Sequence, residues 1–401
     1  MHSRIAAVVL ASAAITACAT GSRSTAAPSI EITTGFQEIY AVYSQPGLVR
    51  GAKSSRSSIM LTRLKLTNTS QHEQRIRSCQ ISFFGNKTLF QTGFLNEETL
   101  KRETAAAKQY ISNINFQTLI KGDGFYDSAQ VIDTLSLAPG QSFMIFRQYF
   151  DLTAQEPVDR LRISCDTDTT SAVTDIPIVQ YSNKNHYRFP LNGDFLLIGN
   201  VYDVWGHRSK PWEEFGLDAV ALGPNQRVYN KTITRNRDHY VFGREVIAPA
   251  DGTVVKVYDG LEDNPVPCDR AKIDEHIAKV GKSFPLFQRL SGNQVVIEHP
   301  NGEFSHLVHL KTHSILVKVG DAVRQGQTIG KVGNSGDGSN GPHLHYHLSN
   351  GPDALKARSL PVKFDNVENS YFSTLFMDKQ GIPKDIRHVF DQSGGLLVHA
   401  Q

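Results

Sequence analysis

The sequence predicts a mainly β protein, with an N-terminal β-sandwich-like domain over residues 31–185 and a compact antiparallel β domain over residues 186–362. A chain of 401 residues is longer than one ordinary hydrophobic core supports, which predicts two domains. In the first domain, runs that alternate apolar and polar residues, such as residues 63–67, are separated by turn clusters such as Pro139-Gly140. In the second domain, glycine-rich turns separate pairs of predicted strands. The C-terminal segment, residues 363–401, contains no motif.

The first 17 residues have the pattern of a secretory signal peptide. A short charged start precedes an apolar stretch over residues 5–15, which is too short to span a bilayer. The stretch runs into Ile15-Thr16-Ala17-Cys18, which resembles the lipobox at which bacterial lipoproteins are cleaved and lipidated. We therefore expect a lipid on Cys18, a tether over residues 18–30 and a location at the periplasmic face of the outer membrane. An ordinary signal peptide with an incidental Cys18 is the alternative.

Charge and cysteine content narrow the class of protein. The net charge of +3 and the lack of a Lys/Arg-rich run give no indication of a nucleic-acid partner. The cysteines after Cys18 are too widely spaced for a zinc site of the cysteine type. Cys79 and Cys165 each share an alternating apolar face with their neighbours, so we predict a disulfide between them, with two buried free thiols as the alternative. Cys268 is then the odd thiol.

Two stretches interrupt the strand pattern. Residues 96–109 are rich in good helix formers, and Asn96 is suited to cap a helix there. Residues 260–291 combine prolines with a helix-like run, and we expect this insertion at the rim of the functional site. The N-terminal domain contains no catalytic constellation, so we expect it to be a spacer, a substrate-docking module or a cover for an active site.

Three alternating histidines carry the strongest chemical signal. In an extended strand the side-chain period of two places His343, His345 and His347 on one face. Such a cluster indicates metal binding or proton transfer, and a merely structural cluster is the alternative. A catalytic zinc ion needs about three protein ligands and an open position, so at least one further donor must come from elsewhere in the chain.

The candidate donors are His207 and Asp218. Asp218 lies in an otherwise apolar run, and a buried aspartate in such a run is rarely unpaired. The structural alternatives are an Asp218 that is hydrogen-bonded to a neighbouring turn and a His207 on the surface beside Arg208.

The order of these motifs resembles the lysostaphin/LytM-type zinc metallopeptidases, which are peptidoglycan endopeptidases. The resemblance covers about residues 196–362 and is tightest over residues 243–348. It includes the Gly-Thr-Val-Val sequence at residues 252–255, a later His-Leu pair and the Gly-Pro-His-Leu-His-Tyr sequence at residues 341–346. By this resemblance, the zinc ligands are His207, Asp218 and His345, and the catalytic histidines are His343 and His309.

The first ligand departs from the family pattern. The family usually spaces its first pair as His-x3-Asp, whereas Glu214 stands four residues before Asp218 and His207 stands eleven residues before it. Some members resemble this chain in having a longer loop there, so we prefer His207 to Glu214.

Other histidines are assigned by spacing. His306 is the rival of His309, and its odd spacing predicts that it lies on the opposite face of the strand. His347 stands where the family more often has a different residue, so we expect it to support the ligands or line the groove. We expect the remaining three to be surface residues: His239, His299 and His313.

The resemblance implies a zinc-dependent endopeptidase that hydrolyses the peptide cross-links of bacterial peptidoglycan. Zinc would activate water and polarise the scissile carbonyl, His343 would accept a proton, and His309 would donate to the oxyanion or the leaving amine. The expected partners are peptidoglycan peptides and, through Cys18, a membrane, with a protein activator left open. No nucleic acid is expected.

Two other classes of protein are alternatives. The first is a non-catalytic cell-wall scaffold or amidase activator with the same fold, which would have lost zinc ligands. The second is a lipoyl- or sugar-phosphotransferase-like carrier, suggested by residues 319–327. The signal peptide argues against this carrier.

Overall fold

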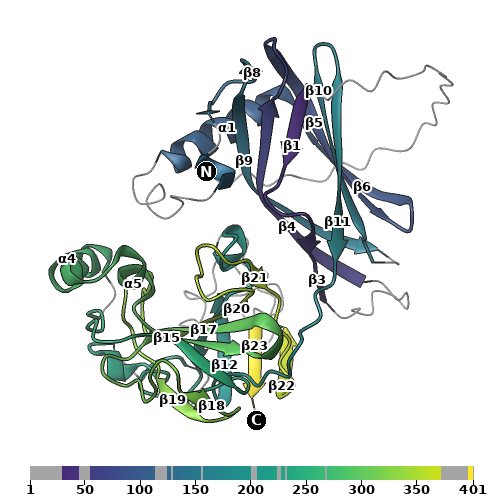
Figure 1. The fold of residues 1–401 in the computed structure, drawn as a ribbon. Helices are drawn as coiled ribbons and strands as arrows, with labels where there is room; N and C mark the ends of the chain where they lie inside the picture. The colour runs from purple at the N-terminus through teal and green to yellow at the C-terminus, as the bar shows by residue number, and fades with distance from the viewer. Residues whose placement is uncertain are drawn as a thin grey trace.

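The computed structural model describes residues 29–44, 55–112, 124–127, 130–154, 157–199, 206–223, 227–230, 233–266, 269–371 and 396–400. This part of the chain is mainly β, as predicted, and Figure 1 shows N-terminal sheets above a C-terminal sheet. The predicted signal peptide, Cys18, most of the predicted tether and Cys268 lie outside the described residues. Among the described helices, none is both long and apolar enough to cross a membrane.

Two sheets make up the N-terminal part. The first runs in the order β1-β4-β9-β7, with β3 also paired to β4, and the second runs in the order β2-β11-β10-β5-β6, with β8 also paired to β5. The strands of the first sheet are β1 (Ile30–Thr33), β3 (Val42–Ser44), β4 (Ser55–Asn68), β7 (Gln130–Val131) and β9 (Gln141–Ala154). The strands of the second are β2 (Ile39–Tyr40), β5 (Gln74–Gly85), β6 (Thr88–Leu95), β8 (Ser136–Leu137), β10 (Arg160–Thr167) and β11 (Ser171–Val179).

Alternating side chains from both sheets form one apolar core. Leu64 and Phe143 come from the first sheet, and Ile81 and Leu161 come from the second. All four are buried, because the period of two along each strand turns their faces inward.

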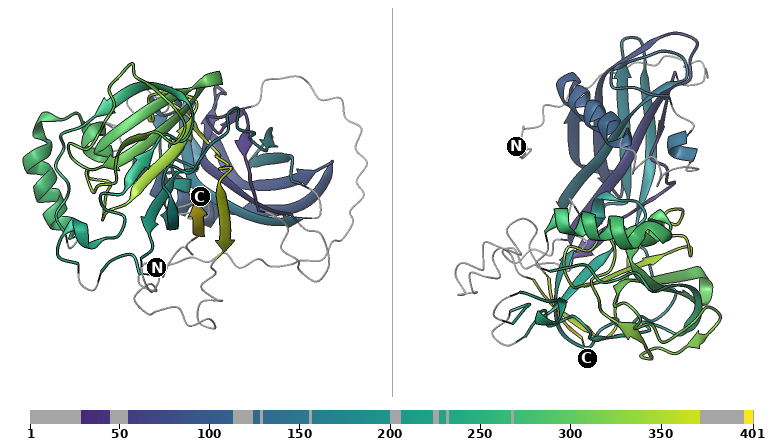
Figure 2. Two further views of the ribbon diagram at one scale, coloured as in Figure 1. Left: turned by 90° about the horizontal axis from the view of Figure 1, so that it is seen from below. Right: turned by 90° about the vertical axis from the view of Figure 1, so that its left-hand side faces the viewer.

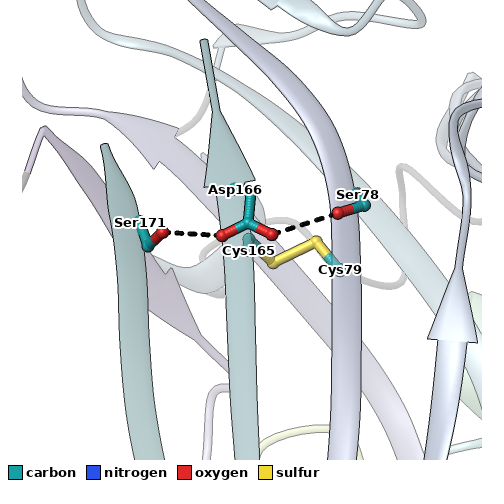
Figure 3. Close-up of a disulfide and its surroundings, with 5 residues drawn as sticks. All are labelled: Ser78, Cys79, Cys165, Asp166 and Ser171. Carbon is teal, nitrogen blue, oxygen red and sulfur yellow. Dashed lines mark hydrogen bonds between the residues drawn. A yellow bond between two sulfur atoms is a disulfide. The ribbon is translucent and has the colours of Figure 1, made fainter. Parts of the chain in front are cut away.

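A disulfide lies in this core (Figure 3). Cys79 and Cys165 are directly opposite each other in the antiparallel pair β5–β10, and their sulfur atoms are bonded. Beside the bond, Asp166 accepts hydrogen bonds from Ser78 and Ser171 on the two neighbouring strands. The disulfide therefore closes a loop of 86 positions between strands that are already paired.

A helix covers one side of the N-terminal sheets. α1 (Glu97–Ile111) begins after Asn96, whose side chain accepts a hydrogen bond from the Thr99 backbone at 2.9 Å, so the predicted cap is confirmed. The short helix α3 (Gly124–Asp127) packs nearby, with Phe125 and Tyr126 in one cluster with Ala107 of α1. In the right-hand view of Figure 2, α1 lies against the side of these strands.

A larger sheet follows, in the order β18-β15-β16-β17-β20-β13-β12-β23-β22, with β21 also paired to β20. A separate pair joins β14 (Glu245–Ile247) to β19 (Thr328–Lys331). The strands of the larger sheet are β12 (Gly193–Gly199), β13 (Leu217–Ala221), β15 (Gly252–Tyr258), β16 (Asn293–His299), β17 (Glu303–Leu310), β18 (Ala322–Val323), β20 (Leu344–Ser349), β21 (Ser359–Leu360), β22 (Val367–Tyr371) and β23 (Leu396–Ala400). Strands β22 and β23 lie within the predicted C-terminal segment, residues 363–401, and they extend the same sheet.

Short helices lie in the connections of the C-terminal part. The insertion contains α4 (Arg270–Val280) and α5 (Leu286–Ser291), and Ile273 and Ile277 of α4 pack on Leu261. The 3-10 helices are η1 (His207–Ser209), η3 (Asn236–Asp238), η4 (Gly281–Ser283) and η5 (Pro300–Gly302).

A buried glutamate anchors the segment that joins the two parts. The carboxylate of Glu303, at the start of β17, accepts hydrogen bonds from the hydroxyls of Tyr181 and Tyr187 at 2.6 and 2.8 Å. It also accepts from the Lys184 backbone and the Asn185 side chain. Burial alone would raise the pKa of Glu303, but these hydrogen bonds lower it below its usual value.

The loop between η1 and β13 is packed directly against the N-terminal part. The Arg208 side chain is fully buried, pairs with the Glu214 carboxylate and donates to the Ser58 carbonyl of β4 at 3.0 Å. Its guanidinium also lies over the Phe215 ring, and Phe215 contacts Tyr40 of β2. These contacts hold residues 206–216 between the two parts of the molecule.

We predict that reduction of the Cys79–Cys165 disulfide lowers the free energy of unfolding by about 2–4 kcal/mol, because the reduced unfolded chain regains loop entropy. Urea unfolding with and without a phosphine reductant measures the change, with Cys268→Ala in both samples to remove the odd thiol. Equal unfolding midpoints in the two samples would contradict the prediction.

We predict that Glu303→Gln lowers the free energy of unfolding by about 1–3 kcal/mol at pH 7. The folded pKa of Glu303 lies below the usual value of 4.5, so its stabilisation is present above that pH and is lost as the pH falls through the folded pKa. The difference between wild type and variant in urea unfolding should therefore stay constant down to about pH 5 and shrink as the pH falls below 4.5. The exposed Glu298→Gln serves as the control, and a difference that grows at low pH would refute the assignment.

Candidate metal centre and catalytic cavity

The alternating histidines lie at the centre of the larger sheet. Strand β20 pairs with β13 on one side and with β17 on the other. Asp218 of β13 is directly opposite His345 of β20, and directly opposed residues project from the same face of a sheet. His207 approaches this face from η1, outside the sheet.

Three side chains converge there. His207, Asp218 and His345 each offer one ligand atom, and these atoms all lie within 4.8 Å of one another. His207 Nε2 is 2.8 Å from Asp218 Oδ2, and His345 Nδ1 is 3.0 Å from Asp218 Oδ1. The structure thus brings together the three residues that the sequence nominates as metal ligands.

The donor set fits a divalent cation such as zinc. Both ring nitrogens of His207 are buried, and neither makes a hydrogen bond of good geometry to the described residues. A buried polar atom without a partner is costly, and a cation among the three side chains would satisfy the Nε2 atom. Two imidazoles and one carboxylate with an open position are typical of a catalytic zinc site.

The carboxylates at the centre stabilise a positive charge between them. Burial alone would lower the pKa of His207, but Asp218 and Glu213 raise it to about 10. Burial alone would raise the pKa of Asp218, but His207 and His343 hold it well below its usual value. Asp218 is therefore ionised at neutral pH, and the centre attracts a cation.

Two further histidines flank the centre with fixed tautomers. His343 Nδ1 is 2.7 Å from the Gly341 carbonyl oxygen, and His309 Nδ1 is 2.7 Å from the Ser335 carbonyl oxygen. A carbonyl oxygen only accepts, so Nδ1 carries the proton in both rings and the neutral rings have a bare Nε2. His343 Nε2 is 3.5 Å from Asp218 Oδ1, and the His309 and His343 rings lie 4.8 Å apart.

This tautomer refines the role that the sequence suggests for His309. Burial, together with His343 and His345, lowers the pKa of His309 well below its usual value. Its Nε2 is therefore an acceptor in the neutral ring, and it can donate to an oxyanion or an amine only after it takes up a proton.

The predicted position of His306 is wrong. His306 is directly opposite His347 of β20, and the two rings stack with centroids 4.3 Å apart, so it lies on the same face as the alternating histidines. The reason is the backbone of His309, whose φ of 62° breaks the strand alternation at the end of β17. His347 in turn lies 2.8 Å from the non-ligating Nε2 of His345, so it supports a ligand.

Among the three histidines expected at the surface, His299 is also misplaced. It is 2% exposed and contacts the Asp251 carbonyl and the Ser305 hydroxyl through its two nitrogens. His313 is exposed as expected, and His239 is half-buried.

Glu214, the rival of His207, does not reach the centre. Its carboxylate pairs with Arg208 at the junction with the N-terminal part, and only 3% of the residue is exposed. The burial of Arg208 explains why Glu214 is held there, because a buried arginine needs a carboxylate partner.

A cavity of about 390 Å³ opens beside the centre. Tyr110 of α1 lines it from the N-terminal part, and Phe287 and Leu290 line it from the insertion, which therefore lies at the rim as expected. Lys210, Trp212 and Glu213 also line it. No motif marks these loop residues, because only the three-residue spacing from His207 links Lys210 and Glu213 to the site.

Part of the chain matches a known protein family. Residues 239–357 match the model of Peptidase family M23, so the chain carries a domain of this LytM-type peptidase family. The matched range contains His309, His343 and His345, and it begins after His207 and Asp218.

Three curated proteins are similar in sequence. An uncharacterized metalloprotease of Buchnera aphidicola is 28% identical over 211 residues, which is 50% of this chain and 47% of the relative. Two peptidoglycan DD-endopeptidases of Vibrio cholerae match shorter stretches. ShyC is 46% identical over 62 residues, 16% of this chain and 14% of the relative. ShyA is 50% identical over 58 residues, 14% of this chain and 13% of the relative. The chain thus spans about half the length of the first relative and a small part of the other two.

Among solved structures, the catalytic domain of lysostaphin from Staphylococcus simulans is 23% identical, with 33% of this chain and 84% of that chain covered and a TM-score of 0.20. The catalytic domain of EnpA from Enterococcus faecalis is 19% identical, with 45% and 92% covered and a TM-score of 0.23.

We predict that His207→Ala lowers the zinc content from about one ion per chain to near zero, whereas Glu214→Gln retains zinc, because only His207 completes the ligand set. Elemental analysis after dialysis against buffered zinc measures both, and exposed His313→Ala is the matched control. Zinc retained by His207→Ala and lost from Glu214→Gln would reverse the assignment.

Proposed function

We propose that this protein is a zinc-dependent endopeptidase that hydrolyses peptide cross-links of bacterial peptidoglycan. The observation that carries the proposal is the convergence of His207, Asp218 and His345 beside a cavity and beside two histidines whose neutral rings have a bare Nε2. The match to Peptidase family M23 supports it. So does similarity to two relatives named as peptidoglycan DD-endopeptidases.

The role of each histidine follows from the ring nitrogen that it presents to the centre. His207 through Nε2, His345 through Nδ1 and Asp218 through its carboxylate would hold the zinc ion. When bound, zinc would polarise the scissile carbonyl and activate a water molecule. His343, with Nδ1–H held by the Gly341 carbonyl, accepts a proton at Nε2. His309, once protonated at Nε2, donates to the oxyanion or the leaving amine.

We further propose that a lipid on Cys18 holds the enzyme at the periplasmic face of the outer membrane, within reach of the wall. The lipobox-like sequence supports this location. The Cys79–Cys165 disulfide also supports export, because disulfides persist in oxidising compartments.

A non-catalytic scaffold or amidase activator is the second candidate function, and no specific observation favours it. Such a protein would lack zinc ligands, whereas His207, Asp218 and His345 are all in place.

We predict that the zinc-loaded protein releases new peptide ends from purified peptidoglycan, and that His345→Ala abolishes both zinc binding and release. His309→Ala should retain zinc but lower the turnover rate by about 10²–10⁴-fold, because it removes proton transfer and not a ligand. Chromatography and mass spectrometry of the digests, with His313→Ala as the control, measure the products. Zinc-loaded wild type that leaves the wall intact would favour the scaffold.

A further inference from the structure

One ionised side chain in the cavity has no part in the proposed reaction. Glu213 lies in the loop between η1 and β13, and 16% of its side chain is exposed. Its Oε1 is 3.3 Å from His207 Nδ1, and its Oε2 is 4.0 Å from His345 Nε2. Asp218 faces the other nitrogen of each ring. Asp218 therefore faces the ligating nitrogen of each ring, and Glu213 faces the other nitrogen.

The loop backbone explains why Glu213 reaches His207. The Lys210 backbone donates to the His207 carbonyl, the Glu213 backbone donates to the Lys210 carbonyl, and the Gly216 backbone donates to the Glu213 carbonyl. These bonds close successive turns in the loop, and the turns bring the side chains of Lys210 and Glu213 back to His207.

Lys210 fixes the carboxylate. Its ammonium group contacts Glu213 Oε1, and Glu213 in turn raises the pKa of Lys210. A carboxylate paired with an ammonium group accepts hydrogen bonds and donates none, so Glu213 is suited to an N–H donor on the ligand ring.

Gly216 allows the two ligand rings to come close on the other side of the loop. A Cβ atom at this position would lie 3.1 Å from His207 Cγ, 3.1 Å from His345 Cε1 and 3.0 Å from the Glu213 carbonyl oxygen. The loop therefore packs tightly against both ligand rings, which limits the positions that the Glu213 side chain can take.

We infer that Glu213 is a positioning residue for the metal centre: its Oε1, 3.3 Å from His207 Nδ1, accepts the Nδ1–H once a metal ion holds the ring through Nε2, the nitrogen that faces Asp218. A neutral imidazole carries one proton, so placing it on Nδ1 frees Nε2 for a metal. Carboxylates in this position also orient a ligand ring and increase its basicity. This inference rests on the zinc site of the proposed function.

His345 has a matching acceptor of its own. Its non-ligating Nε2 lies 2.8 Å from His347 Nδ1, so its proton is accepted by a second histidine. The two ligand histidines are thus held by different groups, and loss of Glu213 should disturb His207 specifically.

The test is the zinc affinity of the full chain, measured by competition with a chromophoric chelator. Glu213→Gln should bind zinc about 10–100-fold more weakly than wild type, because the acceptor loses its charge. The second readout is the Nδ1–H proton signal of His207 in NMR of histidine-labelled, zinc-loaded protein, assigned by its loss in His207→Ala. This signal should move upfield in Glu213→Gln, whereas a merely structural role would leave it unchanged.

Lys210→Met tests the same chain of contacts from its other end. It should weaken zinc binding less than Glu213→Gln, and the double variant should be no weaker than Glu213→Gln alone, because both act through one carboxylate. Lys210→Met also carries the test if Glu213→Gln fails to fold. Glu298→Gln, an exposed carboxylate on β16, is the matched control.

The zinc content of the wild type separates failure of this inference from failure of the proposed function. Zinc-binding wild type with unchanged affinity and an unchanged His207 signal in Glu213→Gln would overturn this inference alone. Wild type that binds no zinc would overturn the proposed function and this inference together.

Discussion

The confinement of residues 206–216 between the two parts of the molecule is the constraint on which the candidate metal centre depends. The loop is held on one side by the fully buried Arg208, which reaches the Ser58 carbonyl of β4, and on the other by β13. A buried arginine is tolerated only with partners, and Glu214 supplies the charge. Because His207 and Asp218 lie at the two ends of this loop, its packing sets the distance between them.

The cavity combines segments that are far apart in the sequence. Tyr110 comes from the N-terminal part, Trp212 from the confined loop, and Phe287 from the insertion, and all three line the same space. The N-terminal part is therefore more than a spacer. It contributes surface to the cavity and packs against the loop that carries His207, a candidate metal ligand.

The sequence predicts those features that local patterns encode. Strand alternation predicts the β architecture and the facing positions of Cys79 and Cys165, and Asn96 predicts the start of α1. The position of His306 could not be predicted, because it depends on a left-handed backbone at His309, which no residue type there signals. The role of Glu213 could not be predicted either, because it depends on a run of turns and not on a motif.

The placement of β23 has a consequence for the order of events during synthesis. β12, the neighbour of the strand that carries Asp218, pairs on its far side with β23, about 200 positions later in the chain. That edge of the sheet stays unpaired until residues 396–400 have been made, and such distant pairings form slowly because they close a long loop. The sheet beneath the candidate metal centre is therefore completed late, and until then the strand next to the one that carries Asp218 has an open edge.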